Sequence, residues 1–262
     1  MFPFDYRRPA ALAEAIAAHG GGGDVRYLAG GQSLVPALKL GLAQPSVLLD
    51  IARLPELRRI RAEGPTLVVG AAVTHAAMAE AVVAIPALAM LAGGIGDLQV
   101  RNMGTPGGAL ANNDPACDHA AGVLGLGAVI RTDRREIAAA DFFLGMFETA
   151  LEPGELIVEI VYSLPRRAGY AKVRNPASGY PVVGVFVAET GDGVRVAVTG
   201  AGATAFRLPE FEAALAADFS PLALAGLEVS PDDLNRDLHA SHDYRAHLIG
   251  VLAGRAVADA RR

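Results

Sequence analysis

Two glycine-rich segments carry the groups in this sequence that are best suited to binding an anion. The first comprises residues 29–33, Ala-Gly-Gly-Gln-Ser, between a strand-like stretch and a helix-like one. Glycine lets successive backbone N–H groups point into one concavity, and a following helix adds its dipole. Ser33 adds a hydroxyl. Paired glycines are also typical of a tight turn, so this segment alone leaves both interpretations open.

The second segment, residues 101–118, supplies another hydroxyl followed by a glycine pair. It contains Thr105, Gly107 and Gly108, and continues through the polar run Asn112-Asn113-Asp114. Unpaired polar groups are costly to bury, so polar residues this dense in an apolar chain favour a binding site over core. Two such elements, which we expect to form loops, suit a ligand with two phosphates.

The composition limits the classes of protein that the chain can belong to. At 262 residues it is near the size at which a single core stops growing, so we expect one compact unit of two or three subdomains. A net charge of −5 argues against a nucleic-acid partner. The single cysteine, Cys117, excludes an internal disulfide and a cluster held by four cysteines of this sequence. We expect Cys117 to be a small packing residue.

The sequence contains neither a secretory signal nor a membrane-spanning pattern. The first residues lack an apolar stretch after their charges, and the longest apolar run, residues 82–95, is broken by Pro86 and two glycines. We therefore expect a cytoplasmic protein without a membrane span.

Hydrophobic patterns predict an α+β fold with three parts. Residues 1–56 read as a small βαβ subdomain, with a helix from Pro9 to the glycines at 20–23, strands at 25–29 and 47–51, and a helix after Ser33. Residues 57–165 read as a mixed α/β subdomain. Its expected elements are two strands around residues 63–65, a helix capped by Thr74, a helix at 86–95, a polar loop at 101–119, and strands at 123–131 and 156–164.

Residues 166–262 read as a C-terminal domain with a three-stranded antiparallel sheet and two helices. The expected strands cover residues 169–173, 182–188 and 194–199, and the helices lie near 208–217 and 242–258. Ser241 is placed to cap the last helix, whose exposed face is expected to carry Arg245 and Arg255.

The ordered motifs resemble those of the FAD-binding, or medium, subunits of molybdenum hydroxylases, a family that includes the CO dehydrogenase medium subunit and bacterial xanthine dehydrogenase flavin subunits. The resemblance runs nearly end to end. The matching segments are residues 6–9, 29–34, 39–40, 99–102, 104–105, 107–108, 114–116, 237–239 and 244–245. It implies a PCMH-type FAD-binding fold followed by the C-terminal sheet and helices.

The resemblance also implies which residues contact FAD. Those around the pyrophosphate and ribityl chain are Leu28, Ala29, Gly30, Gly31, Gln32, Ser33, Leu34, Val35, Thr105, Pro106, Gly107, Gly108 and Ala109. Asp118 matches an acid that contacts the cofactor, and Asp114 belongs to the adjoining motif. Ile157, Lys172 and Tyr180 match positions near the flavin ring, where a fixed Lys172 cation would stabilise the reduced, anionic flavin.

Three departures from the family pattern concern the second glycine segment. Pro106 replaces Ile or Leu and lacks an N–H, Ala109 replaces Asn or Ser, and Asn112-Asn113 replaces an Ala-His-Ala context. They motivate an alternative in which the chain is a non-catalytic scaffold subunit with a degenerate flavin site.

The function that the resemblance implies is electron transfer within an oxidoreductase complex. A molybdenum-cofactor large subunit would oxidise substrate, a [2Fe-2S] small subunit would relay electrons, and FAD on this chain would reduce an external acceptor. NAD, a quinone and oxygen remain open as acceptors; CO, a purine, an N-heterocycle and an aldehyde remain open as substrates. A stand-alone flavin oxidoreductase is a further alternative, disfavoured because the sequence shows no substrate acid or base.

Other motifs support weaker hypotheses. Residues 200–205 satisfy the Rossmann pattern but lack the second strand with its acidic end, so we expect a turn there. His239, His242 and His247 have no cysteine or HExxH partner, which disfavours a metal site. Asp114 and Asp118 as an acid–base pair lack a neighbouring nucleophile.

Overall fold

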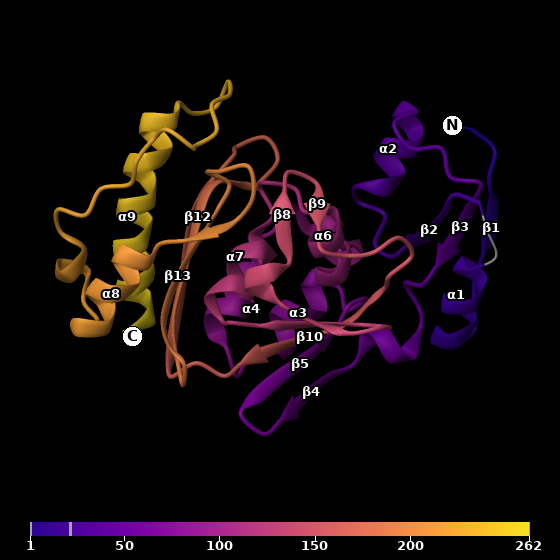
Figure 1. Ribbon diagram of the computed structural model, residues 1–262, viewed down its shortest axis with the longest axis horizontal. Helices are drawn as coiled ribbons and strands as arrows, with labels where there is room; N and C mark the ends of the chain where they lie inside the picture. Colours follow the sequence, from indigo (N-terminus) through magenta and orange to yellow (C-terminus); the bar gives the residue numbers. More distant parts are fainter. Residues whose placement is uncertain (1, 21–22, 262) are drawn as a thin grey trace.

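The computed structural model describes residues 2–20 and 23–261. Three groups of elements follow one another along the molecule in chain order, from the N-terminal strands at one end to the last helix at the other (Figure 1). The mixed helix and strand content confirms the expected α+β class, and the arrangement positions one large cavity.

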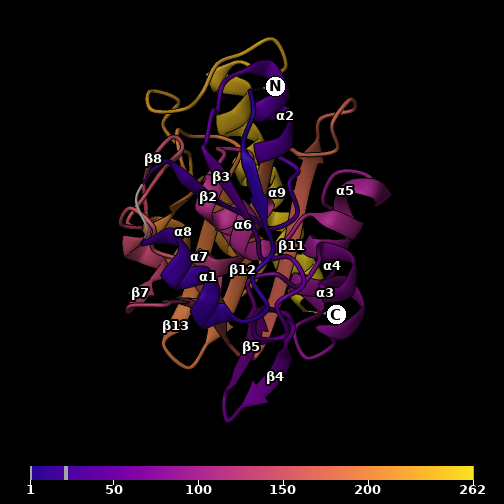
Figure 2. The same cartoon turned by 90° about the vertical axis from the view of Figure 1, so that its right-hand side faces the viewer.

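The N-terminal group is the predicted βαβ unit with one additional strand. It contains β1 (Asp5–Arg7), α1 (Leu12–His19), β2 (Val25–Leu28), α2 (Leu34–Leu40) and β3 (Val47–Asp50). The strands are parallel in the order β1-β3-β2, and Figure 2 views the molecule from this end. Sequence reasoning missed β1 because all its residues are exposed and show no apolar alternation. Of the glycines expected to end α1, residues 21 and 22 lie outside the described residues.

The middle group is built on a five-stranded antiparallel sheet in the order β4-β5-β10-β6-β7. These strands are β4 (Ile60–Glu63), β5 (Thr66–Gly70), β6 (Val129–Thr132), β7 (Glu136–Ala138) and β10 (Ile157–Ser163). A hairpin of β8 (Phe143–Gly145) and β9 (Glu148–Thr149) lies beside it, with single 3₁₀ turns η1 (Pro55–Arg58) and η2 (Ala139–Asp141). Helices α3 (His75–Ala81) and α4 (Pro86–Gly93) begin as predicted, and the Thr74 hydroxyl accepts from the Ala77 N–H.

Two predictions for this middle group are wrong. Residues 101–119 are not a loop, and the strand expected at 123–131 begins only at Val129, because residues 123–125 belong to a helix. The structure has α5 (Leu98–Met103), α6 (Pro106–Asn112) and α7 (Asp118–Gly125). Asp97 and Thr105 cap the first two of these helices by accepting from the N–H groups of Val100 and Gly108. Helix α7 was missed because every one of its residues is buried, which removes the polar face that marks a helix in sequence.

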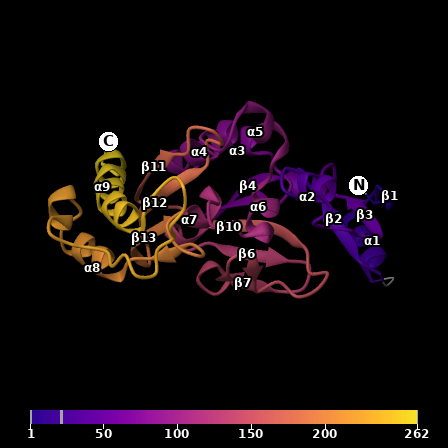
Figure 3. The ribbon, with the colours of Figure 1, turned by 90° about the horizontal axis from the view of Figure 1, so that it is seen from above.

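The C-terminal group is an antiparallel sheet flanked by helices, as predicted, with one short strand more than expected. The sheet runs in the order β11-β12-β13-β14 and comprises β11 (Arg167–Arg174), β12 (Pro181–Thr190), β13 (Gly193–Thr199) and β14 (Phe206–Arg207). Helix α9 (His242–Ala260) packs on β11 and β12, with α8 (Pro209–Ala217) and η3 (Pro221–Leu224) nearby. Helices α4 and α7 contact the sheet from its other face, as Figures 1 and 3 show.

The prediction that Arg245 is exposed is wrong. Its side chain is 3% exposed and donates hydrogen bonds to the carbonyl oxygens of Val182 and Gly200 and to the carboxylate of Asp237. A buried guanidinium is tolerated here because the start of β12 and the residue after β13 supply carbonyl acceptors for it.

One hydrophobic core joins the middle and C-terminal groups. It contains residues of β5 and α4 together with Tyr170, Phe186 and Ala197 from the C-terminal sheet. Because this core is shared, packing does not mark a boundary after residue 165. The expected boundaries after residues 56 and 165 stay predictions. Within the described residues, no helix is long and apolar enough to cross a membrane.

Candidate cofactor-binding site

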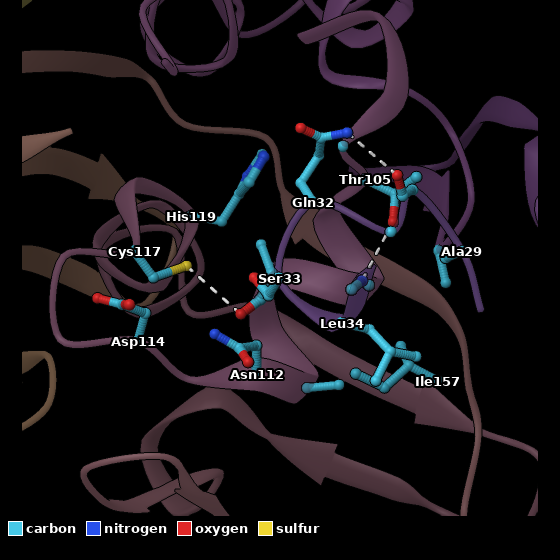
Figure 4. Close-up of a pocket in the computed structure, with 18 of the residues that line it drawn as sticks. Ala29, Gln32, Ser33, Leu34, Thr105, Asn112, Asp114, Cys117, His119 and Ile157 are labelled. Carbon is cyan, nitrogen blue, oxygen red and sulfur yellow. Dashed lines mark hydrogen bonds between the residues drawn. The ribbon is translucent and has the colours of Figure 1, made fainter. Parts of the chain in front are cut away.

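A cavity of about 820 Å³ lies where the N-terminal βαβ unit meets the middle group. Its wall is formed by the turn after β2, the first turns of α6 and α7, residues 151–157 before and at the start of β10, and the 178–180 loop. Figure 4 shows side chains from these segments, among them Ser33, Thr105 and Ile157, gathered around one space.

The cavity wall contains all but three of the predicted site residues. Lining it are Leu28, Ala29, Gly30, Gly31, Gln32, Ser33, Leu34, Thr105, Gly107, Gly108, Ala109, Asp114, Asp118, Ile157 and Tyr180. Val35, Pro106 and Lys172 do not line it. Segments more than a hundred residues apart in sequence thus converge on one space.

The first glycine segment presents a run of unused backbone donors. The N–H groups of residues 31–34 make no hydrogen bond to the described part of the chain, whereas the next one, Val35 N–H, bonds to Gly31 O. Gly31 has φ +70°, which a side chain would strain. Successive unpartnered N–H groups in a concave turn form an anion-binding nest.

The two glycine N–H groups of the second segment are already engaged within the protein. Gly107 donates its N–H to Ala71 O, and Gly108 donates to the Thr105 hydroxyl. A Cβ on Gly107 would lie 2.5 Å from the Ala71 Cβ, so this glycine permits close packing of α6 on the end of β5. Pro106 is the first residue of α6, where an N–H has no helical acceptor, so it removes no hydrogen bond of the helix.

Gly30 holds the two segments together. A Cβ at Gly30 would lie 2.1 Å from Met103 O and 2.7 Å from Gly104 Cα. The turn after β2 therefore touches the backbone that leads into α6, and the distance between the two sides of the cavity depends on this contact.

Asp118 is a buried carboxylate with one oxygen in use and one free. Its Oδ1 accepts from the Tyr170 hydroxyl at 2.7 Å and from Lys172 Nζ at 2.5 Å, whereas Oδ2 has no partner in the described structure. Burial raises the pKa of Asp118, opposed by the Lys172 charge, and burial likewise lowers the pKa of Lys172, opposed by Asp118. Asp118 borders the cavity, and its free oxygen is a buried hydrogen-bond acceptor without a donor.

Lys172 contacts Asp118 and does not line the cavity. Its ammonium also donates to Gly94 O at 2.9 Å and Gly179 O at 3.2 Å, so three acceptors take its three protons. The side chain is 7% exposed. Three acceptors around one ammonium indicate the charged form, which orients the Asp118 carboxylate.

Two cavity residues that sequence reasoning missed are His75 and His119. His119 Nε2 lies 3.0 Å from His75 Nδ1, and both rings are buried. The signal in the sequence was a histidine inside the otherwise small and apolar run 119–125.

In the polar run 112–114, one residue holds a neighbouring hairpin and the other two line the cavity. Asn113, with φ 43°, donates to Gly145 O and Glu148 O and so fixes the β8–β9 hairpin. Asn112 and Asp114 line the cavity. Cys117 does both, since it belongs to the hydrophobic core and also borders the cavity.

Comparison with known proteins identifies the family. The model of the FAD binding domain in molybdopterin dehydrogenase matches residues 2–166. The chain belongs to this family. The carbon monoxide dehydrogenase medium chain of Hydrogenophaga pseudoflava is 34% identical, covering 97% of this chain and 96% of that one. The nicotine 6-hydroxylase medium subunit of Paenarthrobacter nicotinovorans is 33% identical, with the same coverage of 97% and 96%.

The fold matches as well. In the structure of Hydrogenophaga pseudoflava carbon monoxide dehydrogenase that lacks the Mo-pyranopterin moiety, one chain superimposes with a TM-score of 0.87 at 35% identity, covering 98% of this chain and 97% of that one. The family membership confirms the expected resemblance, FAD as the cofactor, and an oxidoreductase subunit as the class of protein.

The residues of this molybdopterin dehydrogenase FAD-binding chain fit the cofactor. FAD carries a pyrophosphate, which requires donors, and a ribityl chain and ring with hydroxyl and N–H groups, which require acceptors. The free N–H groups of residues 31–34 answer the first need, and the unpartnered Asp118 Oδ2 answers the second.

Proposed function

We propose that this chain is the FAD-carrying medium subunit of a molybdenum hydroxylase complex, and that it passes electrons from a partner's [2Fe-2S] clusters to an external acceptor. The observation that carries the proposal is one cavity bordered both by the free backbone donors at residues 31–34 and by Asp118, whose buried Oδ2 has no hydrogen-bond partner in the described structure. A dinucleotide with an anionic middle and a hydroxyl-bearing half needs both.

Each group of cavity residues has a defined task toward the cofactor. The N–H groups of residues 31–34 and the Ser33 hydroxyl would bind pyrophosphate oxygens. Asp118 Oδ2 would accept from a hydroxyl or ring N–H, while Tyr170 and Lys172 hold the carboxylate in place. Bound FAD supplies the electron-transfer chemistry, and the protein supplies position and access.

Two partner subunits complete the proposed pathway. The sequence has one cysteine, so the iron–sulfur clusters would belong to a [2Fe-2S] small subunit and substrate oxidation to a molybdenum-cofactor large subunit. The chain covers 96% of relatives that are themselves named medium chains or subunits, which supports a subunit over a stand-alone oxidoreductase. Pro106 at the first position of α6 weakens the motive for the scaffold alternative.

The test is cofactor content in the presence and absence of the partners. The chain is purified alone and after co-expression with its two candidate partner subunits, and the cofactor released by acid is chromatographed. We expect about one FAD per chain. A complex that assembles without FAD even in excess cofactor would support the scaffold alternative and overturn the proposal.

The acceptor is tested on the FAD-loaded complex. After anaerobic reduction, NAD, a quinone analogue and oxygen are each added while the visible flavin absorbance is followed. Rapid recovery of the oxidised spectrum with one of them identifies its class. Recovery with none of the three contradicts transfer to an external acceptor of these classes.

A further inference from the structure

The histidine pair in the cavity wall comes from two helices. His75 is the first residue of α3, and His119 is the second residue of α7, next to Asp118. Their ring centroids are 4.8 Å apart with the planes tilted by 35°, and one hydrogen bond joins His119 Nε2 to His75 Nδ1. Figure 4 places His119 among the residues around the cavity.

Both rings are uncharged near neutral pH. Burial, with a smaller contribution from Arg101, lowers the pKa of His75 to about 4. Burial also lowers the pKa of His119, as do His75 and Lys172. A neutral imidazole has one N–H and one bare nitrogen, so their shared hydrogen bond couples the two tautomers.

Because of this coupling, one of the two nitrogens outside the shared hydrogen bond, His119 Nδ1 and His75 Nε2, carries a proton and the other does not. If His119 Nε2 donates, then His119 Nδ1 is a bare acceptor and His75 Nε2 carries a proton. If His75 Nδ1 donates, the assignments reverse. His75 Nε2 lies against the backbone that leads to Thr105, since a Cβ on Gly104 would be 2.8 Å from it.

His119 Nδ1 is left without a partner. The residue is 0% exposed, and this nitrogen makes no hydrogen bond in the described structure. An unsatisfied buried polar atom is unfavourable, so its persistence in a cavity wall calls for a ligand that satisfies it. Oδ2 of the preceding residue, Asp118, is unsatisfied too, so two consecutive residues at the start of α7 each carry a buried polar atom without a partner.

The chemistry of these neighbours selects one half of the cofactor. A carboxylate repels phosphate, so the pyrophosphate belongs at residues 31–34 and the uncharged ribityl and ring portion belongs beside Asp118. We propose that His119 Nδ1 forms a hydrogen bond with this uncharged portion of FAD, and that His75 is a positioning residue that orients the His119 ring and shares its tautomer. The inference rests on the proposed function, because it takes FAD as the ligand.

Two substitutions separate the roles of the two nitrogens of His119. Asn places its terminal polar atoms two bonds from Cβ, as Nδ1 is, while Gln places them three bonds away, as Nε2 is. His119→Asn thus retains a group for the ligand, and His119→Gln retains a group for His75. FAD titration should show His119→Asn within about threefold of the wild-type affinity and His119→Gln weaker by about tenfold, the equivalent of one hydrogen bond.

The outcomes distinguish this inference from the proposed function. If the wild-type chain, alone and in its complex, takes up no FAD, the proposed function fails. If it binds FAD and both variants bind equally well, or His119→Gln binds better, the function stands and the inference is overturned. The unfolding midpoint of each cofactor-free variant shows whether it is folded.

A measurement on the wild-type chain keeps the inference testable if neither variant folds. The ring nitrogens are observed by NMR after ¹⁵N-histidine labelling, with and without saturating FAD. Binding should shift the His119 Nδ1 resonance and move His75 Nε2 in the opposite sense, since the tautomers are coupled. Stoichiometric FAD with both resonances unchanged overturns the inference.

Discussion

Replacing Gly30 with alanine should damage the cofactor site through packing alone. The added Cβ would sit 2.1 Å from Met103 O, and carbon atoms of this kind are not found within 3.0 Å of such neighbours, so the backbones must separate by about 0.9 Å (3.0 − 2.1). Both partners are backbone, so neither can rotate away. Because φ at Gly30 is not positive, strain in the dihedral angles is not the cause.

The expected loss of stability is about 2–3 kcal/mol, the upper part of the range for overpacking, because the clash is between backbones. FAD affinity should fall by roughly thirtyfold or more, since 2 kcal/mol corresponds to that factor and the contact sets the width of the cavity. Urea unfolding of the cofactor-free chain measures the first quantity, and fluorescence titration with FAD measures the second.

Gly108→Ala is the matched control. Its Cβ would meet Thr105 Oγ1 at 3.0 Å and Ala29 Cβ at 4.0 Å, with no backbone in the way. Alanine also favours a helix over glycine, so stability should hold or rise by up to about 1 kcal/mol, while a methyl group in the cavity wall weakens FAD binding. If Gly30→Ala were as stable as Gly108→Ala, the close contact between the two segments would not exist in solution.

Three further predictions concern buried charges. Lys172→Met should lower the free energy of unfolding by about 3 kcal/mol, because it leaves Asp118 buried without its cation. In urea unfolding, the double variant Lys172→Met/Asp118→Asn should recover part of that loss. A double variant no more stable than Lys172→Met contradicts the prediction. Glu155, whose pKa is lowered to about 2 mainly by a hydrogen-bonded arginine, contributes stability above its ordinary pKa that is lost as the pH falls toward 2. The deficit of Glu155→Gln should therefore be about 2 kcal/mol at pH 7, allowing for the partial exposure of that arginine, and smaller at pH 3; an equal deficit at both values would refute the assignment. Arg245→Met should lower the free energy of unfolding by about 3 kcal/mol, because two carbonyl acceptors lose their donor. Replacing the exposed Arg255 with Met should change it by no more than about 0.5 kcal/mol. Thermal unfolding compares the two variants, and equal effects would contradict the burial of Arg245.

Local patterns predicted much of the fold. The βαβ unit, the strands on either side of residues 63–65, and the last helix were all readable, because apolar periodicity and capping residues such as Thr74 and Ser241 act over a few positions. Helix α7 was not readable, because a helix buried on all sides has no polar stripe. Arg245 was misjudged because the carbonyl acceptors that allow its burial belong to residues 45 and 63 positions away in the sequence.

The sequence motifs predicted which segments form the site, but not the long-range contacts that bring these segments together. Sequence motifs located both glycine segments and Asp118, and the structure gathers them around one cavity. The distinct roles of Gly30 and Gly107 as packing positions depend on neighbours far away in sequence, which no local pattern contains. The His75–His119 pair was missed for the same reason, since 44 residues separate its members.

Lys172, which bonds to Asp118 at the cavity, lies outside the residues that match the family model. The family match ends at residue 166, whereas Lys172, the ion-pair partner of Asp118, lies in β11. Helix α7, which carries Asp118, packs against the sheet to which β11 belongs. A fragment cut at the end of the match would retain the glycine segments and lose the support behind Asp118. The C-terminal sheet thus supports a residue that borders the cavity, although the sheet lies outside the matched span.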